Sequence, residues 1–121
     1  MAAERGNQAV AGLADGLHPS VLRLIRVVAE AAEAHGKWVG VCGELGSDPA
    51  AVPLLVGLGV SELSVNPPAI PATKEAVRQL DTESAGLLAR EALGTASAED
   101  VRVLVGGATE ASIELSETST P

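Results

Sequence analysis

The sequence predicts an α/β fold, the C-terminal part of a (β/α)8 barrel with two parallel strands and flanking helices. Hydrophobic residues make up 46% of the 121 positions, yet the chain has one Trp and neither Phe nor Tyr. A core of Val, Leu, Ile and Ala favours helices on parallel strands over an aromatic-rich β-sandwich. Helical segments alternate with short apolar ones, which implies right-handed parallel strand–helix units. Two strands cannot form a viable parallel sheet alone, so we expect them to belong to a barrel of roughly 250 residues.

The first helix is predicted to begin at Pro19, where a missing N–H costs nothing, and to end at His35-Gly36. Its apolar residues recur at helical spacing: Val21, Leu24, Ile25, Val28 and Ala32. Lys37 to Cys42 is short, apolar and rich in β-forming residues, so it predicts a buried strand.

A second helix is predicted to follow a polar loop, with Asp48 as its cap and Pro49 as its first residue. It ends near Gly57–Gly59, and Pro53 inside it indicates a short or kinked helix. Ser61 to Val65 is then the second strand.

Two further helices are expected after a turn at Asn66-Pro67-Pro68: one from Pro71 to about Leu80, and one capped by Asp81-Thr82 and ended by Gly94. Ser97–Asp100 resembles the capping box of a last short helix, Val101 to Val105. We therefore expect three segments: a barrel portion (1–94), a terminal short helix (95–105) and a flexible acidic tail (106–121).

The charge and the cysteine content exclude several classes of protein. Eight Lys and Arg against 16 Asp and Glu give a net charge of −8, which argues against nucleic-acid binding. A single Cys rules out an internal disulfide framework and fits a reducing cytosol. The longest uncharged stretch, Pro49–Ser61, is shorter than the roughly 20 apolar residues of a membrane span. We expect a soluble, cytoplasmic protein without membrane insertion.

Cys42 is the residue best suited to chemistry, because it ends a predicted strand where the chain turns at Gly43. Strand carboxyl ends line the active site of a barrel. Thiols have an ordinary pKa of about 8.5, so at neutral pH they can donate a proton, or attack as thiolate if a base helps. The alternative is a cysteine that fills space in the core.

Other polar residues have structural alternatives. Glu44 and Asp48 could hold magnesium through water, although Asp48 before a proline fits a helix cap better. Arg5, among small residues, could clamp a phosphate or carboxylate, or lie on the surface. His18 and His35 are expected to flank the first helix.

The segment Lys37–Asp48, Lys-Trp-Val-Gly-Val-Cys-Gly-Glu-Leu-Gly-Ser-Asp, closely resembles the active-site cysteine segment of enzyme I of the bacterial sugar phosphotransferase system. This family is the phosphoenolpyruvate–protein phosphotransferases. Arg5–Asn7, Pro19–Ile25 and Leu58–Val65 look like the same family, in order and without gaps to about residue 94.

The resemblance implies a transferase that binds phosphoenolpyruvate and Mg²⁺ at the mouth of a C-terminal barrel. A histidine of an N-terminal domain takes the phosphoryl group and passes it to the histidine-containing phosphocarrier protein for sugar uptake. Cys42 matches the cysteine that protonates the enolate of pyruvate, and Arg5 matches an arginine that binds phosphoenolpyruvate. The phosphorylated histidine and the acidic Mg²⁺ ligands lie outside this chain in that alignment. No metal ligand is therefore assigned here, and the chain alone is expected to be inactive.

Three interpretations remain open. The first is the C-terminal barrel portion of a cytoplasmic, homodimeric enzyme I. The second is a non-catalytic dimerisation or decoy module. The third is a fragment of pyruvate phosphate dikinase or phosphoenolpyruvate synthase, which share related cysteine loops. Leu45, where the dikinase usually has His, and the segment Ser61–Ile70 favour enzyme I.

Overall fold

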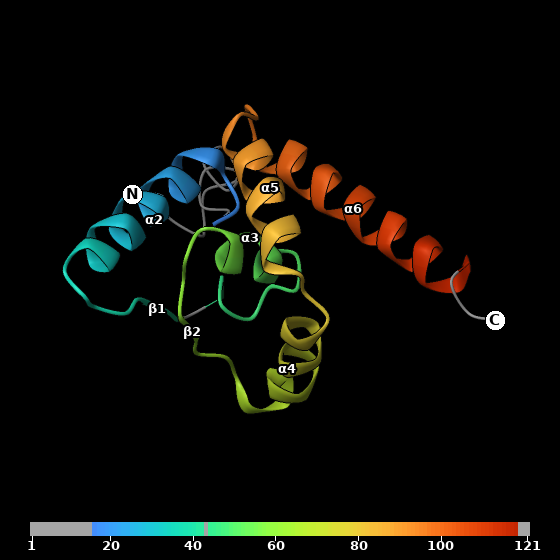
Figure 1. The fold of residues 1–121 in the computed structure, drawn as a ribbon, viewed down its shortest axis with the longest axis horizontal. Coiled ribbons are helices and arrows are strands. Elements are labelled where there is room, and N and C mark those ends of the chain that lie inside the picture. The colour runs from blue at the N-terminus through green and yellow to red at the C-terminus, as the bar shows by residue number, and fades with distance from the viewer. Residues whose placement is uncertain (1–15, 43, 119–121) are drawn as a thin grey trace, which may run out of the picture.

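The computed structural model describes residues 16–42 and 44–118. Helices dominate the described fold, and two short strands lie beside them (Figure 1). In chain order the elements are α2 (Pro19–Ala34), β1 (Gly40–Val41), α3 (Ala51–Gly57), β2 (Glu62–Leu63), the 3-10 turn η2 (Pro67–Ala69), α4 (Ile70–Arg78), α5 (Thr82–Leu93) and α6 (Ala98–Thr118).

The two strands are parallel, which confirms the expected α/β arrangement of this part of the chain. Gly40 pairs with Glu62 and Val41 with Leu63. The expectation of a buried strand over 37–42 is wrong, because β1 has two residues, of which Gly40 is exposed and Val41 half-buried. A parallel strand is buried when strands and helices cover both its edges and faces. In the part of the chain that the structure describes, the sheet consists of β1 and β2 alone.

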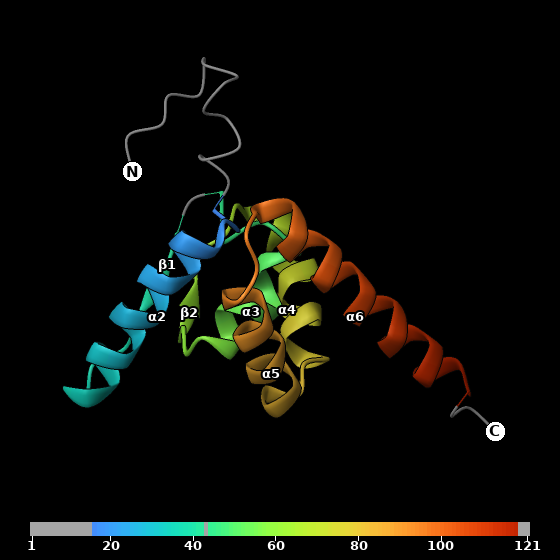
Figure 2. The ribbon, with the colours of Figure 1, turned by 90° about the horizontal axis from the view of Figure 1, so that it is seen from above.

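The core lies around α3 and α5, which pack against each other at the centre of the molecule (Figure 2). Helices α2 and α6 diverge on either side of them. The buried cluster is wholly apolar and includes Leu17, Leu22, Ala51, Leu54, Leu55, Leu58, Ala89, Ala92, Leu93, Ala98, Val101 and Val105. Arg23 ties α2 to the end of α5 by donating from Nη2 to the carbonyl oxygen of Leu93, at 2.9 Å.

Local signals set most helix ends as expected. Pro19 is the first residue of α2, and the N–H of Ser20 donates to Nδ1 of His18 at 3.1 Å. Gly36, at φ +67°, ends the helix in a conformation that favours glycine. Asp81 caps α5 by accepting from the N–H of Ser84 at 3.1 Å.

Helix α3 begins two residues later than expected. The carboxylate of Asp48 accepts from the N–H of Ala50 at 3.0 Å in a tight turn, and the helix starts at Ala51. Pro53 therefore lies in the first turn, where its missing N–H leaves no helical hydrogen bond unmade. The helix is short rather than kinked.

One face of α2 differs from the predicted apolar stripe. Leu22 and Ala29 are buried, and Ile25 packs on the core, but Leu24 and Val28 are 60% and 56% exposed. Tertiary packing is the cause. Among the described residues, other elements cover the side of α2 with Leu22 and Ala29 but not the side with Leu24 and Val28.

Helix α6 corrects the predicted short helix at 101–105 and the flexible tail at 106–121, since residues 106–118 are helical. It begins at Ala98, three residues before the predicted start, and the predicted cap is present, with Oγ of Ser97 accepting from the N–H of Asp100 at 3.1 Å. Val101 and Val105 anchor its first turns in the core. Gly106 and Gly107 each cost a helix about 1 kcal/mol, which cooperative extension from an anchored segment offsets. Residues 119–121 lie outside the described part.

None of the helices in the described ranges is long and apolar enough to cross a membrane.

Candidate functional site

Cys42 directly follows β1 and is exposed. It stands at the carboxyl end of the strand, as the sequence predicts, and it does not fill space in the core. Gly43, the residue at which the chain turns, lies outside the described residues.

The pairing of the strands determines which way Cys42 faces. Val41 and Leu63 pack on the helical core. Side chains alternate along a strand, so the next pair in register, Cys42 and Ser64, belongs to the opposite face. The N–H of Ser64 donates to the carbonyl oxygen of Val41 at 2.8 Å, which continues the parallel alignment by one residue.

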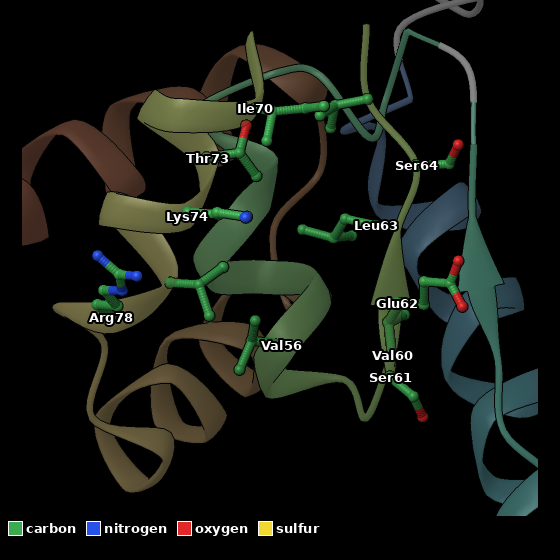
Figure 3. Close-up of a pocket in the computed structure, with 12 residues that line it drawn as sticks. Val56, Val60, Ser61, Glu62, Leu63, Ser64, Ile70, Thr73, Lys74 and Arg78 are labelled. Carbon is green, nitrogen blue, oxygen red and sulfur yellow. The ribbon is translucent and has the colours of Figure 1, made fainter. Parts of the chain in front are cut away.

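Glu62 and Ser64 lie on the side of β2 opposite Leu63 (Figure 3). The face away from the helices therefore carries the Cys42 thiol and the Ser64 hydroxyl at its carboxyl edge. The Glu62 carboxylate lies on the same face, two residues before Ser64. Sequence reasoning singled out Cys42 but missed Glu62 and Ser64. Strict alternation within the predicted strand Ser61–Val65 would have identified them.

The loop after β1 is held by several contacts. Leu45 packs on the core cluster, and a Cβ at Gly16 would come within 2.8 Å of Leu45 Cδ1. The N–H of Ser47 donates to the carbonyl oxygen of Glu44 at 3.2 Å. Oγ of Ser47 accepts from the N–H of Asn66 at 3.4 Å, which joins the loops that follow the two strands.

Asp48 serves a structural purpose. Its Oδ1 accepts from the N–H of Ala50, and its Oδ2 lies 3.0 Å from Nη2 of Arg102. Asp48 therefore links the turn before α3 to α6. Glu44 is exposed. Within residues 16–42 and 44–118, no three His, Cys, Asp or Glu side chains gather closely enough to hold a metal ion.

The two predicted histidines lie at the ends of α2. His18 caps the start of α2, and Nδ1 of His35 lies 2.8 Å from the carbonyl oxygen of Ala31 at its end, so both flank the helix as predicted. Arg5 lies outside the described residues.

An open groove of about 600 Å³ lies between β2, α3 and α4 (Figure 3). Its apolar lining includes Val56, Val60, Leu63, Ile70 and Val77. Lys74 and Arg78 of α4 line it as well. Glu62 and Ser64 of β2 also line the groove, whereas Cys42 is not among its lining residues.

Residues 1–82 match the family described as "PEP-utilising enzyme, PEP-binding domain". The chain is similar to a multiphosphoryl transfer protein of Escherichia coli O6:H1, with 45% identity over 104 residues. A protein of the same name from Xanthomonas campestris pv. campestris is 47% identical over 104 residues. Each alignment covers 86% of this chain and 12% of the relative.

A phosphoenolpyruvate-protein phosphotransferase of Listeria monocytogenes is 43% identical over 105 residues, which are 87% of this chain and 18% of the relative. The chain thus spans 12% to 18% of the length of these three curated relatives.

Proposed function

This chain belongs to the PEP-utilising enzymes, through their PEP-binding domain, and we propose that it forms the proton-donating part of a phosphoenolpyruvate–protein phosphotransferase. The position of Cys42 carries the proposal: the thiol is exposed at the carboxyl end of β1, on the face away from the helices. The family match spans both Cys42 and Arg5.

We propose that β1 and β2 are consecutive strands of a (β/α)8 barrel. Their parallel register and the helices on one face support this arrangement. In such a barrel the opposite face, with Cys42, Ser64 and Glu62, points to the interior, and the carboxyl edge opens to the substrate.

The reaction then proceeds in two steps. The P–O bond of phosphoenolpyruvate breaks and a P–N bond forms with a histidine outside this chain, which leaves the enolate of pyruvate. The enolate carbon takes the proton from the Cys42 thiol, so that pyruvate and a thiolate result, and the exposed thiolate recovers a proton from water. A thiol suits this position because, when neutral, it does not repel an anionic ligand.

Arg5 is the proposed phosphoenolpyruvate ligand, because a guanidinium offers paired N–H donors to phosphate or carboxylate oxygens. Mg²⁺ is proposed as cofactor of the complete enzyme. The resemblance to this family implies that the acidic ligands of the ion lie outside this chain. The phosphocarrier protein, a cytoplasmic location and a homodimeric enzyme belong to the same proposal.

The test uses a chimera of the Listeria monocytogenes phosphotransferase in which this chain replaces the matched region. Cys42→Ala should lower the rate of pyruvate formation by about 10²- to 10⁴-fold, the usual contribution of a positioned general acid. Phosphoryl exchange between the phosphorylated chimera and the carrier protein should remain unchanged, because it needs no proton on carbon. Val103→Ala, at an exposed position of α6, is the control and should match the parent in both assays. Undiminished pyruvate formation in Cys42→Ala would refute the role of the thiol.

A further inference from the structure

We propose that Arg102 of α6 is a positioning residue for the proton donor, and that it acts through its ion pair with Asp48. The proposal rests on the proposed function, because it names a residue that supports Cys42 in that reaction. The described residues that follow β1 are Cys42 and 44–48, and we call them the cysteine loop. Asp48 is the last residue of this loop, so its anchor limits where the loop can lie.

The ion pair joins two elements that are 54 positions apart in the chain. Nη2 of Arg102 donates to Oδ2 of Asp48 at 3.0 Å, and the two side chains are 43% and 24% exposed. The other carboxylate oxygen, Oδ1, accepts from the N–H of Ala50 at 3.0 Å. Because each oxygen has a partner of its own, the carboxylate is held in one orientation.

Helix α6 gives this anchor a firm support. Val101 and Val105 are both buried in the core cluster, so the backbone that carries Arg102 is fixed relative to α3 and α5. Arg102 also lies beyond residues 1–82, which match the PEP-binding domain. The ion pair thus connects the cysteine loop to a helix outside the matched residues.

Backbone hydrogen bonds carry the position of Asp48 back toward the thiol. The N–H of Asp48 donates to the carbonyl oxygen of Leu45 at 3.3 Å, and the N–H of Ser47 donates to that of Glu44 at 3.2 Å. Glu44 is only two residues from Cys42. When Asp48 loses its anchor, the turn over 44–48 opens more often, and the thiol is less often in place for proton transfer.

A second ion pair supplies a matched control. Nε of Arg26 lies 2.9 Å from Oε1 of Glu30, one turn further along α2, and both side chains are exposed. This pair has the same chemistry and a similar distance, but it joins residues of a single helix and does not contact the cysteine loop. Arg26→Gln therefore removes an ion pair without removing the anchor of the loop.

Hydrogen exchange of the 121-residue chain tests the anchor without any substrate. Arg102→Gln should lower the protection factors of the Ser47 and Asp48 amides by about twofold to fivefold, which is the range for a partly exposed ion pair. Asp48→Asn keeps an oxygen for the N–H of Ala50 and should have the same effect. The double variant should be no less protected than either single variant, because both remove one interaction. Arg26→Gln should match the parent.

The chimera with the Listeria monocytogenes phosphotransferase tests the consequence for the reaction. Arg102→Gln should lower kcat for pyruvate formation by about the same twofold to fivefold, with KM for phosphoenolpyruvate and phosphoryl exchange with the carrier protein unchanged. At about 1 M salt, where the screening length is about 3 Å, the difference from the parent should shrink. Arg26→Gln should retain the kcat of the parent.

Three results would overturn the proposal: unchanged protection of Ser47 and Asp48 in Arg102→Gln, an equal loss of protection throughout the core, or reduced loop protection with the kcat of the parent. The second result would mean that the ion pair stabilises the whole fold and not the loop. A failure of the proton-donor role appears elsewhere, as undiminished pyruvate formation in Cys42→Ala. The exchange measurement does not depend on that role, so the two failures are distinguishable.

Discussion

Gly57, the last residue of α3, lies directly against the backbone of α5. A Cβ at this position would overlap the carbonyl oxygen of Ala85 and lie 2.6 Å from its carbonyl carbon and 3.0 Å from Cβ of Ala89. Its φ is not in the left-handed region, so the backbone itself does not demand glycine. Gly57→Ala therefore tests the packing of α3 on α5 by steric overlap alone.

The magnitude follows from the geometry. Ordinary contacts of a Cβ lie at 3.4–4 Å, so the two helices must separate by about 1 Å to admit the methyl group. Overpacking of this kind costs about 1–3 kcal/mol. We expect Gly57→Ala at the upper end of this range, because the overlapping atoms of Ala85 belong to the backbone and cannot rotate away. Replacing glycine by alanine in a helix returns at most about 1 kcal/mol. We expect a net loss of about 2 kcal/mol in the free energy of unfolding.

Urea denaturation of the 121-residue chain, followed by far-ultraviolet circular dichroism, measures this loss as a lower midpoint at unchanged m-value. Gly86→Ala is the matched control, because Gly86 lies within α5 and a Cβ there meets nothing within 4 Å. That variant should gain about 0.5–1 kcal/mol from lower chain entropy in the unfolded state. Equal effects of the two substitutions, or a stabilised Gly57→Ala, would refute the close approach of α3 and α5.

Two further predictions concern α6 and the cap of α5. Val101→Ala should cost about 2 kcal/mol, because Val101 is fully buried in the core cluster, whereas Val103→Ala should change stability by less than about 0.5 kcal/mol; equal urea midpoints would contradict the orientation of α6. Hydrogen bonds from the hydroxyl and the N–H of Ser84 lower the pKa of Asp81 from its ordinary value of 3.8. The Asp81 carboxylate therefore stabilises the fold above pH 3.8, and this contribution is lost as the pH falls through the lowered pKa. The stability difference between the parent and Asp81→Asn should therefore shrink on acidification below about pH 4, and a difference that stays constant with pH would contradict this linkage.

Much of the secondary structure could be predicted because its signals are local. Pro19 and Gly36 delimit α2, Asp81 caps α5, and Gly94 follows its last residue, each through the conformation or hydrogen bonding of a few neighbouring residues. The position of Cys42 at a strand end was predictable for the same reason. The interaction that the resemblance implies between Arg5 and the substrate remains a prediction, since Arg5 lies outside the described residues.

Where prediction failed, the missing information was tertiary. Apolar periodicity placed Leu24 and Val28 on the apolar stripe of the first helix, yet both are exposed, because periodicity identifies a helix face and not the element that covers it. The prediction of a flexible tail rested on the low complexity of residues 106–118. It failed because these residues extend a helix that Val101 and Val105 anchor on the core. Amino-acid composition does not indicate which residues pack on the core.

The sequence by itself determined the chain of helices and short strands, the thiol at the end of β1, and the resemblance to phosphoenolpyruvate-utilising enzymes. Capping, proline placement and short motifs act over a few residues, so they can be interpreted without coordinates. Only the tertiary structure decided that α3 and α5 touch at Gly57, that Ser64 shares the face of Cys42, and that Leu24 and Val28 are exposed. These features depend on contacts between residues far apart in the chain, and such contacts form only when the elements pack together.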